Sequence, residues 1–153
     1  MTADGLNALL EISHATADDI PRARRFYTER NYGGGIQRED LVLVAEYQGQ
    51  VVGIVRLAPE QGTTVLRGMQ VDPAFQRQGV GMRLLAAVAQ VLGNQRCFCI
   101  PYTHLADFYG KIDFVVIDPA EAPAFLRSRL ATYQQRGDGK EYVLMCRDGM
   151  AGR

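Results

Sequence analysis

The sequence predicts a single domain of the mixed α/β class, and two observations carry that prediction. The chain has 153 residues, the size of one ordinary domain, and no repeat, low-complexity tract or long linker divides it. Apolar residues follow the two-residue period of strands in some segments and the 3.6-residue period of helices in others. One strand and one helix come first, then a three-stranded meander, and then helices and strands alternate.

The N-terminal half contains most of the predicted strands. A helix is expected to begin after Thr16, its N-cap, and to end at the glycines at 33–35. Gln48-Gly49 is the expected turn of a hairpin, and residues 59–62 form the next turn. The strands expected in this half lie at 9–13, 41–47, 50–57 and 64–71.

The C-terminal half alternates helices with short strands. One apolar helical face begins at Gly79 and ends near Gly93-Asn94. The other expected elements are strands at 96–100, 114–117 and 141–146, a short helix at 105–112, and a longer helix that starts between 119 and 123.

Charge and composition argue against several classes of protein, including nucleic-acid-binding, membrane and disulfide-rich proteins. Seventeen Lys and Arg residues balance seventeen Asp and Glu residues, so no global positive charge recruits nucleic acid or an anionic membrane. No apolar run approaches the roughly 20 residues that cross a bilayer, and the N-terminus lacks the basic region of a signal peptide. Three cysteines are an odd number and do not suggest a disulfide framework. We expect a cytoplasmic protein with no nucleic-acid or membrane partner.

Residues 66–82 carry the strongest functional signal. A predicted strand ends there, a loop with Gly79 and Gly81 follows, and an amphipathic helix begins at once. The first amides of a helix have no partner within it and carry partial positive charge, so they hold phosphate groups well. Glycine lets the backbone approach such a ligand, and Arg77 adds a positive charge. The alternative is a loop whose glycines serve only tight packing.

Two common phosphate-binding patterns do not fit this loop. A P-loop needs Lys-Ser or Lys-Thr after its last glycine, where this sequence has Met82-Arg83. The dinucleotide fingerprint needs three glycines in the G-x-G-x-x-G register, and only two are present.

A third pattern does fit. Residues 76–81, Gln-Arg-Gln-Gly-Val-Gly, resemble the Gln/Arg-x-x-Gly-x-Gly/Ala pyrophosphate loop of the GCN5-related N-acetyltransferases (GNAT). Val71-Asp72-Pro73 is similar to that family's strand exit, and residues 105–114 are similar to its A-x-x-F-Y-x-x-x-G-F segment. The resemblance implies one GNAT domain over residues 1–153, with its core at about 9–147. It also implies a mixed, mostly antiparallel central sheet with a splayed centre, flanked by helices.

The resemblance assigns roles to individual residues. Backbone groups of Met69, Gln70 and Val71 would pair with the pantetheine arm of acetyl-CoA, and one N–H there would polarise the acetyl carbonyl. Tyr109 matches the tyrosine that protonates the departing CoA thiolate; the alternative is a core aromatic residue on a helix. The expected pyrophosphate-binding residues are Gln76, Arg77, Gln78, Gly79, Val80, Gly81 and Met82.

The sequence departs from the family pattern at three places. Tyr102 stands where many relatives have asparagine, so the cofactor contacts of that side chain are not carried over. Asp113 replaces a glycine and would have to adopt a helix-ending conformation that glycine accepts more easily. Val65 and Cys97 stand where some relatives place a general base.

Two side chains are candidates for the missing base. Glu46 reaches the cleft through a water, or it is an exposed carboxylate before a turn. His104 acts as a base or a substrate contact, or it is a helix-capping or partly buried structural residue. A third alternative is loss of the amine proton to solvent, which needs no side chain.

Two further sets of residues have both a functional and a structural interpretation. Arg56 and Arg67 either select a carboxylate-bearing substrate or are solvated side chains on an open face. Cys97 and Cys99 face the same side of a strand, but two ligands do not make a zinc site and Cys146 is remote in sequence. We therefore expect small buried cysteines and no metal.

The expected function is acetyl-CoA-dependent N-acetyl transfer to a primary amine of a small molecule or a protein. The alternative from another class is a non-catalytic CoA-binding regulatory module that acts through a protein partner. The absence of an obvious general base favours the regulatory alternative, whereas the retained Tyr109 favours an enzyme. A third interpretation, a nucleotide phosphate-binding domain, is supported by the glycine loop alone. Strand edges in the resembled fold often pair between subunits, so the resemblance also allows a homodimer.

Overall fold

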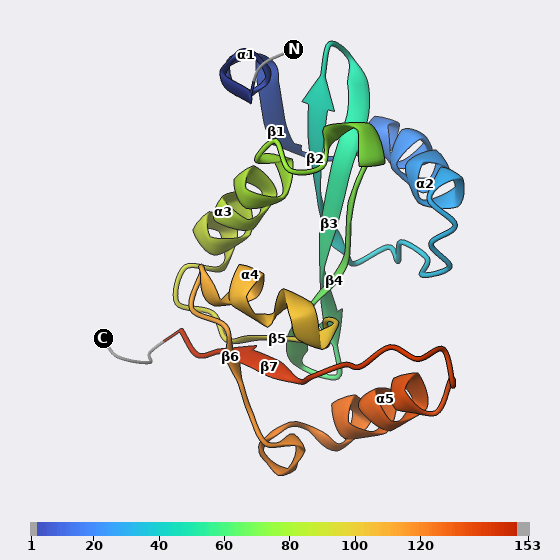
Figure 1. Cartoon of the computed structure of the whole chain (residues 1–153), viewed down its shortest axis with the longest axis vertical. Helices are drawn as coiled ribbons and strands as arrows, with labels where there is room; N and C mark the ends of the chain where they lie inside the picture. Colours follow the sequence, from blue (N-terminus) through green and yellow to red (C-terminus); the bar gives the residue numbers. More distant parts are fainter. Residues whose placement is uncertain (1–2, 150–153) are drawn as a thin grey trace. The chain divides into compact units, whose positions relative to one another are not determined.

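A seven-stranded sheet dominates the computed structural model of the chain, which describes residues 3–149 (Figure 1). Its strands are β1 (Leu10–His14), β2 (Leu41–Tyr47), β3 (Gln50–Glu60), β4 (Thr63–Val71), β5 (Cys97–Cys99), β6 (Val115–Val116) and β7 (Met145–Arg147). Their order in the sheet is β1-β2-β3-β4-β5-β7-β6. The pairs β1–β2, β2–β3, β5–β7 and β6–β7 are antiparallel, whereas β4 and β5 are parallel. The predicted fold class, a mixed and mostly antiparallel sheet with helices, is confirmed.

Helices follow or precede most strands, as the sequence predicts. The α-helices are α1 (Ala3–Leu9), α2 (Ile20–Glu29), α3 (Val80–Leu92), α4 (Ala106–Gly110) and α5 (Ala124–Gln134). The 3-10 helices are η1 (Ala17–Asp19), η2 (Pro73–Phe75), η3 (Thr103–Leu105) and η4 (Pro119–Glu121). Helix α1 has no counterpart in the sequence prediction, which assigns Leu9 to a strand. Within residues 3–149, no helix is both long enough and apolar enough to span a bilayer.

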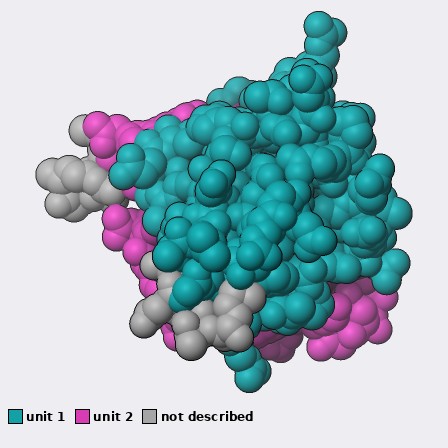
Figure 2. All heavy atoms as spheres, turned by 90° about the horizontal axis from the view of Figure 1, so that it is seen from above, with its two compact units in different colours: residues 1–62, 66–91 teal, residues 63–65, 92–153 magenta. Residues whose placement is uncertain are grey.

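The chain divides into two compact units, which Figure 2 shows in different colours. Unit 1 comprises residues 1–62 and 66–91, and unit 2 comprises residues 63–65 and 92–153. Strand β4 contributes to both, because Thr63–Val65 belong to unit 2 and the rest of the strand to unit 1. The register pair between β4 and β5 joins Val65 to Phe98 within unit 2.

Helix α2 and strands β2 and β3 build the core of unit 1. At the start of this helical segment, the backbone amide of Thr16 donates to Asp19 Oδ2 at 2.8 Å, and Pro21 occupies the first turn of α2. The helix ends at Glu29, earlier than predicted, because Asn31 takes a left-handed conformation with φ of +57°. The buried residues of this core are Ala23, Phe26, Tyr27, Ile36, Val42, Val44 and Ile54.

The meander differs from the prediction at its second turn. Strand β3 runs on to Glu60, so Pro59 lies inside the strand rather than in the turn. The turn itself is Gln61-Gly62, with φ of +50° and +76°, values that suit the twist of a tight hairpin. Proline is tolerated at 59 because the register of β3 with β2 ends at Leu57.

Helix α5 and strands β5 and β7 build the core of unit 2. The predicted strand at 141–146 is wrong in its bounds: Tyr142 makes an isolated bridge to Tyr102, and the regular strand begins at Met145. Cys146 lies opposite Phe98 in the register of β5 with β7. The buried residues of this core are Val65, Phe98, Ala122, Leu126, Leu130, Leu144 and Cys146.

Candidate functional site

The loop that follows β4 is shaped by its own polar side chains. Asp72 caps η2 by accepting a hydrogen bond from the Ala74 amide at 2.9 Å. The amide nitrogen of the Gln76 side chain donates to the carbonyl of Val71 at 3.1 Å, and that of Gln78 donates to Ala74 at 3.2 Å. The two glutamines of the predicted motif therefore hold the loop in shape.

The end of this loop delivers the chain into the first turn of α3. Arg77 and Gly79 have φ of +64° and +89°, and open space surrounds the position that a Cβ on Gly79 would take. The amide of Arg83 donates to the carbonyl of Gly79 at 3.0 Å, which leaves the amides of the preceding helical turn without a partner inside the helix. Such a positively polarised turn is chemically suited to an anion such as a pyrophosphate.

A polar atom beside this turn is also unsatisfied. The Oε1 atom of Gln78 is buried and has no hydrogen-bond partner among the residues that the structure describes. The free first-turn amides and the open backbone of Gly79 fit the pyrophosphate that the resemblance implies, whereas Gln78 Oε1 is an acceptor and does not bind an anion. All of the predicted cofactor-binding residues, from Met69 to Met82, belong to unit 1.

Strand β4 changes direction just before Met69, Gln70 and Val71. Gly68 has φ of +65°, and the Tyr27 hydroxyl donates to its carbonyl oxygen at 2.7 Å. A Cβ at Gly68 would lie 2.3 Å from Tyr27 Oη, so only glycine fits. Nothing in the sequence pairs Tyr27 with Gly68, although a glycine inside a strand pattern is a general signal for a bulge or a close approach.

Arg56 is buried against the loop that contains the three glycines, so of its two alternatives the solvated side chain is wrong. Its side chain is 1% exposed, and its Nη1 donates to Asp40 Oδ2 at 2.7 Å and to the carbonyl of Gly35 at 2.8 Å. Burial alone would lower the pKa of Arg56, but nearby Tyr27 and the hydrogen bond to Asp40 outweigh it and raise that pKa. Burial likewise raises the pKa of Tyr27. Arg56 therefore ties this loop to β3 through the chain's own carboxylate.

Two other candidates of unit 1 are also paired with side chains of the chain. Arg67 Nη1 lies 3.5 Å from Glu60 Oε2, and both side chains are partly exposed. Glu46 accepts hydrogen bonds from Arg22 at both carboxylate oxygens, at 3.1 and 3.4 Å. Glu46 is thus an ion-paired carboxylate before the turn.

Tyr109 lies in unit 2, on α4, and it is 5% exposed. Its ring makes edge-to-face contacts with Phe108 and Phe114, at centroid distances of 5.0 and 6.1 Å. The segment ends at Asp113, whose φ of +75° confirms the expectation that this residue takes a conformation that glycine accepts more easily.

His104 and Tyr102 precede α4 and contact each other. His104 is exposed, so it is not the partly buried residue of the structural alternative, and its ring stacks on Tyr102 at 5.6 Å with 12° between planes. Tyr102 is the N-cap of η3 and is half-buried.

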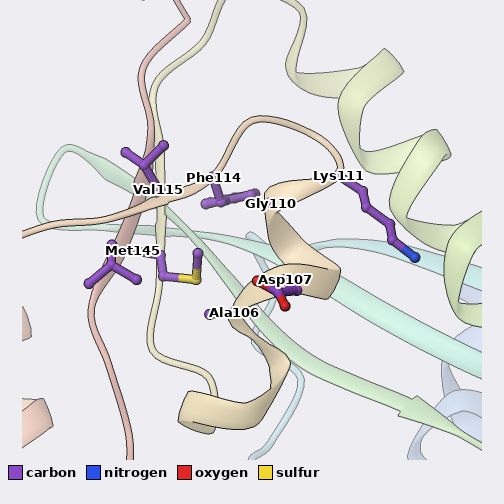
Figure 3. A pocket seen from close by; sticks show the side chains of 8 residues that line it. Ala106, Asp107, Gly110, Lys111, Phe114, Val115 and Met145 are labelled. Atoms are coloured by element: carbon purple, nitrogen blue, oxygen red, sulfur yellow. The ribbon is translucent and has the colours of Figure 1, made fainter.

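A pocket of about 550 Å³ lies beside the α4 segment, within unit 2 (Figure 3). Phe114 and Met145 are its buried apolar lining residues, and Asp107 is the carboxylate among the lining residues. Figure 3 shows that Lys111 directs its ammonium group away from Val115 and Met145. The pocket therefore offers a mainly apolar surface.

The three cysteines are buried in unit 2, as predicted. Burial raises the pKa of Cys99 well above its ordinary value, and neighbouring Cys97 and Cys146 raise it further. Across residues 3–149, no group of three or more His, Cys, Asp or Glu side chains is arranged to hold a metal ion.

Comparison with known proteins supplies independent information. A family model described as acetyltransferase (GNAT) domain matches residues 38–116, a span that includes the loop and Tyr109. A search of curated proteins found no match.

Several solved structures have a similar fold. The ribosomal-protein-S18-alanine N-acetyltransferase of Escherichia coli is 18% identical, with coverage of 90% of this chain and 92% of that one and a TM-score of 0.63. A GNAT-family acetyltransferase from Streptococcus pneumoniae is 15% identical, with coverage of 90% and 98% and a TM-score of 0.66.

A third similar structure is longer than this chain. N-acetylglutamate synthase from Neisseria gonorrhoeae, complexed with coenzyme A and N-acetyl-glutamate, is 22% identical with a TM-score of 0.62. The match covers 90% of this chain and 34% of the synthase, so this chain spans about a third of that protein. At these identities the similarity concerns the fold.

Proposed function

Because the chain belongs to the GNAT acetyltransferase domain family, we propose that it transfers the acetyl group of acetyl-CoA directly to a primary amine. The acceptor is a small molecule or a protein. The observation that carries the proposal is the first turn of α3, where free amides adjoin the open backbone of Gly79 inside the matched span. The coenzyme A bound to N-acetylglutamate synthase, a protein of similar fold, supports the same cofactor here.

In the proposed reaction, each part of the site has one task. The amides at the start of α3 and the Arg77 side chain bind the pyrophosphate, and backbone groups of Met69, Gln70 and Val71 hold the pantetheine arm. Acetyl-CoA supplies an activated acetyl thioester and a thiolate leaving group. An N–H group of β4 polarises the acetyl carbonyl.

Two proton transfers complete the proposed reaction. A C–N bond forms between amine and acetyl carbon as the C–S bond breaks, and Tyr109 donates its phenol proton to the departing sulfur. Because a thiol titrates near ~8.5 and a phenol near ~10, this transfer is uphill by only about 2 kcal/mol, a small cost for a general acid that acts as the C–S bond breaks. Since Arg22 engages both oxygens of Glu46, we assign the proton lost by the amine to water or to exposed His104.

Replacement of Gly81 by glutamate tests the cofactor site. Gly81→Glu should abolish acetyl-CoA binding in calorimetric titration, because it places a carboxylate where the pyrophosphate would bind. An acidic residue in the first turn favours the helix, so the variant should fold. Ala86→Glu adds the same charge at an exposed position of α3 and should bind as the wild type does. Equal binding by Gly81→Glu and the wild type would refute the assignment of the loop.

Replacement of Tyr109 by phenylalanine tests the proposed acid. The variant keeps the edge-to-face contacts of the ring, so it should bind acetyl-CoA normally while turnover falls by roughly 10²-fold or more. Release of CoA thiol with a panel of amines measures turnover, and Tyr133→Phe on α5 is the matched control. Unchanged turnover in Tyr109→Phe would remove this residue from the mechanism. A wild type that binds acetyl-CoA but never releases CoA thiol would support the regulatory alternative instead.

A further inference from the structure

A row of aromatic side chains runs through unit 2. Ring centroids are 5.6 Å apart between His104 and Tyr102, 5.1 Å between Tyr102 and Tyr142, and 5.1 Å between Tyr142 and Tyr133. The backbone bridge between Tyr102 and Tyr142 fixes the middle of this row, which the amide of Thr103 supports by donating to the carbonyl of Glu141 at 2.9 Å. The tyrosines are half-buried, so part of each ring faces solvent.

The chain places one of its own ammonium groups on this row. Lys140 Nζ lies 5.0 Å from the centre of the Tyr102 ring and donates to Tyr102 Oη at 3.1 Å. That hydrogen bond raises the pKa of Lys140 and so favours the charged form. Asp138 completes the surroundings, since its carboxylate accepts from the Lys140 backbone amide at 2.9 Å and from the Tyr142 hydroxyl at 3.4 Å.

The tyrosine rings, the phenol oxygen of Tyr102 and the carboxylate of Asp138 are all groups that bind cations. The face of an aromatic ring attracts an ammonium group electrostatically, and a phenol oxygen accepts one of its protons. A carboxylate held beside the ring adds attraction for positive charge and repels anions.

Lys140 is only weakly held in this position. Its side chain is exposed, and an exposed cation–π contact stabilises a cation by a factor of roughly two to five. The neighbouring Gly137 and Gly139 have φ of +67° and +75°, with open space around each, so the loop that carries Lys140 is built from conformationally permissive residues. A second ammonium group can therefore displace Lys140.

We propose that Tyr102, Tyr142 and Asp138 form the binding site for the ammonium group of the acceptor, and that Lys140 occupies this site when the acceptor is absent. The inference rests on the proposed function and names its acceptor class, a primary amine on a flexible alkyl chain, as in lysine. Tyr102 begins the helical segment that continues through η3 into α4 and Tyr109. His104, one of the two proposed proton acceptors, stacks on Tyr102 and lies beside the site.

Direct binding of n-butylammonium and of a short lysine-containing peptide tests the proposal without acetyl-CoA. Shifts of the tyrosine ring resonances on titration report the dissociation constant for each probe. Lys140→Met keeps an unbranched side chain but removes the charge, so it should tighten binding by roughly two- to five-fold. Tyr102→Leu removes the ring and should weaken binding at least as much, and Tyr102→Phe, which keeps the ring, should have a smaller effect.

A control variant and a second readout separate the outcomes. Arg129 lies 5.5 Å above the Phe125 ring on α5, outside the row, and Arg129→Met should leave both dissociation constants unchanged. Binding that is unaffected by Lys140→Met, or equally affected by Arg129→Met, would overturn the proposal. Release of CoA thiol, measured on the same variants, should show the same changes in KM for the amine. If the variants change amine binding as expected but no CoA thiol is released, the ammonium site is supported and the acetyltransferase function is refuted.

Discussion

The conformation of Gly68 depends on a contact with a side chain that is remote in sequence. Tyr27 lies on α2 and its hydroxyl meets the carbonyl of Gly68 at 2.7 Å, at the point where β4 turns with φ of +65°. This contact shapes the backbone that leads into the proposed pantetheine-binding residues. It also leaves no room for a larger residue, because a Cβ on Gly68 would approach Tyr27 Oη to 2.3 Å.

Gly68→Ala should therefore lower the free energy of unfolding by roughly 2–5 kcal/mol, from a left-handed alanine together with overpacking. Tyr27→Phe removes one hydrogen bond and should cost about 1 kcal/mol. The double variant should lose less than the sum, because removal of Oη leaves Tyr27 Cζ at 3.0 Å as the nearest atom. Urea unfolding of the wild type, the two single variants and the double variant measures the free energies of this double-mutant cycle. Strictly additive losses would show that the two residues do not act on each other.

Residues of the site differ in how far the sequence predicts them. The glycine loop and the conformation of Asp113 are local properties, and both follow from neighbouring residues in the chain. Arg56 is different, because its partner Asp40 and the Gly35 carbonyl lie in a preceding loop that the strand pattern does not connect to it. A charged residue in a strand suggests a solvated face, and only the folded arrangement reveals a buried ion pair.

The end of the α4 segment shows strain that the corresponding glycine of the family would not have. Asp113 adopts φ of +75°, and its amide donates to the carbonyl of Gly110 at 3.0 Å. Asp113→Gly should raise the free energy of unfolding by roughly 0.5–1 kcal/mol, since glycine adopts this conformation without a Cβ penalty but loses more chain entropy.

Thermal unfolding measures this effect, and Asp113→Asn is its control. Asparagine removes the charge of Asp113 but keeps a side chain that tolerates the left-handed region. We expect the order of melting temperatures to be glycine, then asparagine and aspartate close together. A glycine variant that melts no higher than the asparagine variant would contradict an origin in backbone strain.

Elements were predicted well where apolar periodicity is long and poorly where it is short. Helix α3 begins at Val80 and ends at Leu92, close to the predicted bounds, because a continuous apolar face and Gly93 mark it. The strand predicted at 141–146 is reduced to Met145–Arg147, since Tyr142 pairs only as an isolated bridge. Pro59 was assigned to a turn because the sequence does not show that β2 ends its pairing at Leu57.

At the scale of the whole molecule, the order of elements and two motifs were enough to predict the family. The aromatic row of unit 2 was not predictable in the same way. Tyr102, Tyr133 and Tyr142 come from three separate segments, and their contacts arise only when the start of η3, α5 and the chain before β7 meet. Long-range packing of this kind has no periodic signal in one sequence.

The division of β4 between the two units has a consequence for synthesis on the ribosome. Every residue of unit 1 emerges before residue 92, so that unit can fold while most of unit 2 is still unmade. During this interval Thr63–Val65 have no β5 to pair with and present an open strand edge to other nascent chains. Two of these three residues are threonines, which favour extended backbone, so this edge stays ready to pair with β5 once Cys97–Cys99 emerge.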